Sequence, residues 1–67
     1  MGTMKVIEIM TESEQGWEDA AQKAVTEAAK SVRNIRSVYL REFTATVEAN
    51  QIKRYRVDTK ITFEVET

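Results

Sequence analysis

The chain has 67 residues and a formal net charge of −1, and it contains neither Cys nor His. The missing residues exclude disulfides, thiolate metal sites and histidine-based catalysis, and the balanced charge argues against a dedicated nucleic-acid binder. A single domain of this size, residues 1–67, rarely draws more than about 3–5 kcal/mol of stability from its own core, so we expect self-association to supply the rest.

The N-terminal residues predict a short first strand over residues 5–10, where β-branched and apolar side chains dominate. No apolar run approaches the roughly 18 residues of a membrane span, and no apolar region follows a basic start as in a signal peptide. We therefore expect a cytoplasmic protein without a membrane partner. Met4 is an alternative natural start, which would make residues 1–3 an addition to the natural chain.

A helix follows, marked by small and apolar residues at steps of three and four. They are Trp17, Ala20, Ala21, Ala24, Val25, Ala28 and Val32. Ser13 is expected to cap the N-terminus of this helix, and Lys30 and Arg33 are expected near its C-terminus, where positive charge suits the helix dipole. Asn34 is expected to end the helix in the left-handed conformation. Trp17 is expected to anchor the core or an interface.

Residues 35–48 and 52–66 predict two long strands joined by a turn at residues 48–51. Strict alternation in the first of these strands leaves both faces partly apolar, so we expect one face to be covered by the helix and the other by another chain. The last strand alternates cleanly from Tyr55 to Val65, which indicates one buried and one polar face. The predicted fold class is α+β, a β-α-β-β unit whose three-stranded antiparallel sheet carries one helix on one face, with the last strand between the other two.

No constellation of residues indicates catalysis, and we expect the chain not to be an enzyme. The basic residues near the ends of the predicted hairpin are best interpreted as a charged surface whose positive charges pair with nearby carboxylates. The alternative is a pocket for an anion or a flat ring, because guanidinium groups bind both. These residues are Arg33, Arg36, Arg41, Lys53, Arg54 and Arg56.

A family resemblance covers residues 5–66. It is carried by Ser13, Gly16-Trp17-Glu18-Asp19-Ala20-Ala21, Ala24-Val25, Ala28, Val32-Arg33-Asn34-Ile35, Val38, Glu42, Tyr55-Arg56-Val57 and Ile61-Thr62-Phe63-Glu64. Together these residues resemble the dodecins. The resemblance implies a non-catalytic protomer that assembles, twelve copies at a time, into a hollow homododecameric shell, with flavins bound in pairs at subunit contacts and sequestered there.

The resemblance also implies a flavin pocket of altered chemistry. Ser37 matches the position of the tryptophan that stacks on the flavin ring, and Arg56 matches a glutamine at the ring edge. Tyr39 lies two residues beyond Ser37 on the same face and could replace part of the stacking surface. A stacking contact is worth about 1–3 kcal/mol, so losing it from each wall of a shared pocket would weaken the binding of riboflavin, FMN or FAD by more than about tenfold. The charge of Arg56 would favour a phosphate-bearing flavin such as FMN.

Two other functions stay open at this stage. A flavin-free homologue could bind another ligand, act as a storage or structural assembly, or bind calcium, as some relatives without the tryptophan do. Calcium needs six to eight oxygen ligands, which Glu residues of several subunits could supply at a symmetry axis. The other alternative is a monomeric or dimeric module that binds a peptide or RNA on its sheet face.

Overall fold

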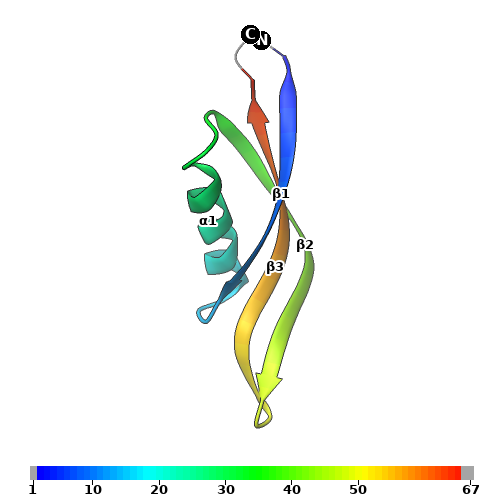
Figure 1. Ribbon diagram of the computed structural model, residues 1–67. Helices are drawn as coiled ribbons and strands as arrows, with labels where there is room; N and C mark the ends of the chain where they lie inside the picture. Colours follow the sequence, from blue (N-terminus) through cyan, green and yellow to red (C-terminus); the bar gives the residue numbers. More distant parts are fainter. Residues whose placement is uncertain (1, 66–67) are drawn as a thin grey trace.

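The computed structural model describes residues 2–65 and confirms the predicted β-α-β-β order (Figure 1). The elements are β1 (Met4–Ser13), α1 (Trp17–Ala28), β2 (Ile35–Glu48) and β3 (Gln51–Glu64). The strands form one sheet in the order β1-β3-β2, and β3 pairs antiparallel with both neighbours. Glu66, included in the predicted last strand, lies outside the described residues. Within residues 2–65, no helix is both long enough and apolar enough to cross a bilayer.

The core lies between α1 and one face of the sheet. Ala24 and Ala28 pack against Ile61 at the centre of β3, and all three are buried. Alanine has no side chain beyond Cβ, so the helix axis can approach the sheet closely. Thr59 is buried on the same face, where its Oγ1 donates a hydrogen bond to the carbonyl of Ile9 at 2.8 Å. The partly buried residues around this cluster are Ile7, Ile9, Val25, Val32, Ile35 and Val38.

The start of the helix differs from the prediction. β1 continues to Ser13, which pairs with Tyr55, so this residue closes a strand and does not cap a helix. Its hydroxyl accepts a hydrogen bond from the amide of Gln15 at 2.8 Å and donates one to Asp19. The N-cap residue is Gly16, with φ of 155°, a conformation that side chains rarely adopt. The cap was misplaced because the edge strand continues to pair with β3 past residue 10.

The helix also ends earlier than predicted. Its last residue is Ala28, and hydrogen bonds from Lys30, Ser31 and Val32 back to the carbonyls of residues 27 and 28 turn the chain toward β2. No basic residue lies in the last helical turn, so the expected dipole contacts of Lys30 and Arg33 are wrong. The left-handed conformation predicted for Asn34 is confirmed by its φ of 62°, but it occurs in the connection, six residues after Ala28.

An irregularity in β2 reverses the faces that strict alternation gives to the side chains beyond Glu42. The register shifts between Arg41 and Thr44, and Glu42 within this shift has a φ of 53°. A bulge of this kind adds a residue opposite β3 and inverts the alternation beyond it. Phe43 therefore shares the helix side with Leu40, whereas Thr44 shares the other side with Arg41. Strict alternation therefore assigned apolar residues to both faces of this strand because it did not allow for the bulge.

The β2–β3 hairpin extends well beyond α1 (Figure 1). Its predicted turn is confirmed: Glu48 pairs with Gln51, and Ala49 and Asn50 both have positive φ, the two-residue geometry that matches strand twist. The molecule measures 51 × 19 × 13 Å, with a radius of gyration of 13.7 Å. A compact domain of this length would have a radius of gyration of about 11 Å. The protomer is therefore elongated, with a small core at one part of its length.

Replacing Ile61 with Val should lower the free energy of unfolding by about 0.5–1.5 kcal/mol, because it removes one buried methylene from the centre of this core. Ile61 has no exposed surface, whereas Ile52, near the hairpin tip, is 51% exposed. Ile52→Val makes the same chemical change at an exposed position and serves as the control. Thermal unfolding of both variants measures the difference, and equal melting temperatures would contradict the location of the core.

Candidate functional site

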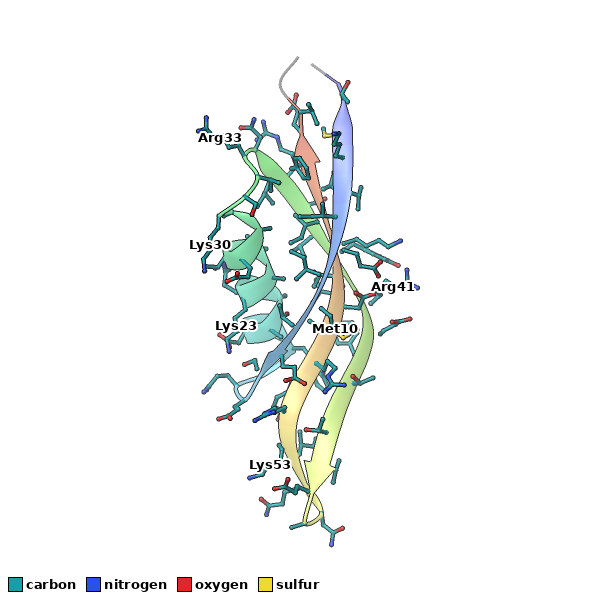
Figure 2. All side chains as sticks on the ribbon, in the orientation of Figure 1. Met10, Lys23, Lys30, Arg33, Arg41 and Lys53 are labelled. Atoms are coloured by element: carbon teal, nitrogen blue, oxygen red, sulfur yellow. The ribbon has the colours of Figure 1, made fainter. Side chains whose placement is uncertain are left out.

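The sheet face opposite α1, called the outer face below, carries the predicted site residues. Strand pairing places sixteen side chains on it: Met4, Val6, Glu8, Met10 and Glu12 from β1, Ser37, Tyr39, Arg41, Thr44 and Thr46 from β2, and Arg54, Arg56, Asp58, Lys60, Thr62 and Glu64 from β3. In Figure 2, Arg41 projects away from α1, whereas Lys23 and Lys30 extend from the helix itself. Nothing in residues 2–65 packs over this face as a further layer.

The protomer brings two of the three predicted site residues together. Ser37 pairs with Thr62 and Tyr39 with Lys60, so their side chains are neighbours along β2. Arg56 lies six residues from Thr62 along β3, a separation of about 20 Å at 3.3 Å per residue. A flat ligand between Ser37 and Tyr39 does not reach Arg56 of the same protomer. A pocket containing all three residue types therefore requires a second subunit, and the pocket stays a prediction.

Arg56 is already bound to a carboxylate of its own protomer. Its Nε donates a hydrogen bond to Oε1 of Glu12 at 2.8 Å, and its Nη2 donates to the same oxygen. The other oxygen, Oε2, is 3.9 Å from Nη1 of Arg54. The sequence reasoning missed Glu12 because it ended the first strand at residue 10. The strand in fact pairs with β3 as far as Ser13, which places Glu12 directly opposite Arg56. Had the predicted strand extended to residue 13, this cross-strand pair of opposite charges would have been recognisable from the sequence.

A second carboxylate pair occupies the centre of the outer face. Asp58 is only 5% exposed, and Nε of Arg41 is 3.9 Å from its Oδ2. A hydrogen bond with Asp58, followed by repulsion from its charge, raises the pKa of Glu8 above its ordinary value of 4.5. Lys60 and Arg41 oppose that shift. The Glu8 carboxyl therefore holds its proton more readily than an isolated glutamate side chain would.

Two of the remaining basic residues, Arg36 and Lys53, also pair with nearby carboxylates, as expected for a charged surface. Arg33 forms no ion pair with another residue of the described range 2–65. Nη2 of Arg36 lies 2.9 Å from Oε1 of Glu64, and Nζ of Lys53 lies 3.8 Å from Oε1 of Glu48. Exposed pairs of this kind contribute at most about 1 kcal/mol each, so they organise the surface more than they stabilise the fold. Within residues 2–65, no group of three or more acidic side chains is arranged to hold a metal ion.

The single tryptophan lies on the helix side of the sheet. The Trp17 ring makes edge-on contacts with Tyr55 and Phe43, at centroid distances of 4.8 and 5.9 Å. Its Nε1 donates a hydrogen bond to the carbonyl of Thr44 at 3.0 Å. Trp17 therefore joins the helix to the hairpin, as predicted for an anchor, and its ring does not lie on the same face as Ser37.

Comparisons with known proteins agree with this architecture. The protein-family model described as Dodecin matches residues 3–66. A search of curated proteins gave no match. A Thermus thermophilus protein is 29% identical, with a TM-score of 0.91 over 97% of this chain and 96% of its own. A dodecin from Streptomyces coelicolor is 26% identical, with a TM-score of 0.89 over 97% and 93%.

A third solved structure carries a different description. It is a calcium dodecin from Mycobacterium tuberculosis, described as a calcium-chelating immunodominant antigen with a novel calcium-binding site. It is 33% identical to this chain, with a TM-score of 0.80 over 97% of this chain and 93% of its own. The similar structures therefore include a protein described as binding calcium.

Glu8→Gln should flatten the acid side of the stability profile. A carboxyl whose pKa is raised in the folded state binds its proton more tightly there, so its stabilising contribution is complete below about pH 4.5 and is lost as the pH rises through the raised pKa. The glutamine variant cannot lose that contribution, so its stability should decline less between about pH 4 and 7. Thermal unfolding across that range measures the difference. Glu14→Gln makes the same charge change in the loop before α1, and an equal flattening there would contradict the assignment to Glu8.

Proposed function

The chain belongs to the dodecin family, and we propose that it assembles into a homododecameric shell that binds a flavin-class cofactor at contacts between subunits. Dodecins are typically flavin-binding dodecamers. They are not enzymes, so membership confirms the expectation of a non-catalytic protein. The ligand and its affinity in this chain belong to the proposal. They are argued below from the outer face and from the residues at the positions that contact the flavin.

The observation that carries the proposal is the exposed apolar surface on the outer face. Val6, Met10 and Tyr39 are 56%, 60% and 63% exposed. Three large exposed apolar side chains on one face of a protein with such a small core favour an interface. Burying apolar surface contributes about 25 cal/mol per Å², so a neighbouring subunit could add the stability that the protomer core lacks.

The pocket is proposed to combine residues of two subunits. Ser37 and Tyr39 of one protomer would line the flat face of the ligand, and Arg56 of another would meet its edge, because the two positions are about 20 Å apart within one chain. Ser37 offers no ring for stacking, and Trp17 is occupied on the other side of the sheet. Tyr39 is then the aromatic surface nearest Ser37. These contacts support a subtype that lacks the flavin-stacking tryptophan and binds flavins more weakly than a tryptophan-lined pocket would.

Calcium binding is the second candidate, favoured by the 33% identity to a structure described as a calcium dodecin. Calcium takes six to eight oxygens, usually including carboxylates. Since no suitable cluster lies within residues 2–65 of one chain, such a site would draw its carboxylates from several subunits. If the chain binds calcium and no flavin, the outer face would only form contacts between subunits.

The assembled mass should be about twelve times the 7.7 kDa of one chain when measured by light scattering. Val6→Lys places a charge in the proposed interface and should shift the mass toward small species, because an unpaired ammonium is costly to bury. Thr26→Lys makes a comparable change on the exposed side of α1 and should leave the mass unchanged. A wild-type mass of one or two chains would rule out the shell.

Ser37→Trp should strengthen riboflavin binding by roughly five- to a hundredfold over wild type, since one stacking contact is worth about 1–3 kcal/mol. Quenching of riboflavin fluorescence on titration with assembled protein measures the affinity. Thr26→Trp, on the exposed side of α1, is the control and should not change the affinity. If neither wild type nor Ser37→Trp quenches riboflavin or FMN at high micromolar protein, the flavin proposal fails. Calcium calorimetry on the same samples, with reversal by EDTA, then tests the second candidate.

A further inference from the structure

Glu12 occupies the hydrogen-bonding edge of Arg56 in the proposed pocket. Its Oε1 accepts hydrogen bonds from both Nε and Nη2, the pair of donors that a guanidinium presents side by side to a carboxylate or phosphate. Its Oε2 faces Arg54 at 3.9 Å. One carboxylate thus lies between two arginines at the end of β1, beside a groove lined by Glu12, Ser13, Glu14, Gln15, Lys23 and Arg54.

The charge of this cluster differs from what Arg56 alone would give. Arg56 and Glu12 neutralise each other, and the remaining positive charge belongs to Arg54, whose contact is longer and whose side chain is 57% exposed. A ligand phosphate would have to displace a carboxylate that is tethered to the same protomer and therefore always present. A ligand without a phosphate asks of Arg56 only a neutral hydrogen bond at its ring edge and keeps its contacts with Ser37 and Tyr39. The pairing with Glu12 therefore weakens its binding less than it weakens the binding of a phosphate, whose contact with a guanidinium is ionic.

We infer that Glu12 is a specificity-determining residue that makes the pocket favour uncharged flavins, such as riboflavin, over phosphorylated flavins, such as FMN. This inference rests on the proposed function, since it assigns the ligand class of the same pocket. The sequence predicted a preference for FMN from the charge of Arg56 alone, and the contact with Glu12 reverses that prediction. The discrimination is moderate, because Arg54 keeps a positive charge close by.

The test is the ratio of the dissociation constants of riboflavin and FMN, measured by fluorescence titration of the assembled protein at low ionic strength. Wild type should bind riboflavin more tightly than FMN. Glu12→Gln frees the guanidinium edge and should shift the ratio toward FMN by about fivefold or more, as expected for a charge-assisted contact. That gain should shrink in high salt, which screens exposed charges.

Two controls separate this effect from net charge. Glu27→Gln changes the net charge equally, but it lies on α1 and pairs with Lys30, so the ratio should stay at the wild-type value. Adding Arg56→Gln to Glu12→Gln should remove the gain, because the freed guanidinium is then absent. Should Glu12→Gln fail to assemble, as judged by light scattering, Glu12→Thr removes the same carboxylate with a residue that favours strands.

The outcomes distinguish this inference from the proposal beneath it. A shift toward FMN in the Glu12 variant, absent in both controls, supports it. Flavin binding with the same ratio in wild type and in the Glu12 variant overturns the inference and leaves the flavin pocket standing. A wild-type preference for FMN overturns it as well. Absence of flavin binding in every variant, including Ser37→Trp, ends both.

Discussion

The structure depends on a mismatch of length between one helix and the sheet it covers. α1 has 12 residues and is about 18 Å long, whereas β2 and β3 have 14 residues each and span about 46 Å. The helix can therefore cover less than half the length of one face, and it covers none of the other. The small alanine-lined core, the projecting hairpin and the bare outer face all follow from that mismatch. Assembly is the simplest way for such a protomer to bury what its own helix cannot reach.

The bulge at Glu42 determines which side chains of β2 lie on the outer face, where α1 does not cover them. Without it, Thr44 would point toward α1 and Phe43 would lie on the outer face. With it, Phe43 contacts Trp17 on the helix side, while Thr44 pairs with Arg56 on the outer face. The same irregularity leaves the Thr44 carbonyl accepting a hydrogen bond from the Trp17 indole. The Trp17 ring thereby connects the hairpin to the start of α1, although the helix does not extend over the hairpin.

The sequence predicted those parts of the fold that follow from periodicity. The strict alternation of the last strand and the spacing of the helical alanines predicted the element order and the buried face. The central position of β3 was predicted from the right-handed crossover between the first two strands, and the structure confirms it. Periodicity could not predict the bulge, because the left-handed φ of Glu42 is imposed by strand pairing on a residue with no special tendency to adopt it. It also could not place the helix cap, because β1 beyond residue 10 is fixed by its pairing with β3. For the candidate site, the face shared by Ser37, Tyr39 and Arg56 could be predicted, whereas the Glu12 partner of Arg56 could not, since it depends on that same pairing.

The electrostatics of the outer face also bear on what it can recognise. Glu12 with Arg56, Asp58 with Arg41 and Glu64 with Arg36 are ion pairs whose charges are satisfied within one protomer. A partner that brings a charge must compete with these tethered groups, and it gains little because the pairs are partly solvated. An uncharged or apolar partner faces no such competition, and it finds the exposed surfaces of Val6, Met10 and Tyr39 between the pairs. The internal pairing therefore favours recognition by shape and apolar contact, which suits both a second copy of the chain and a flat, neutral ring.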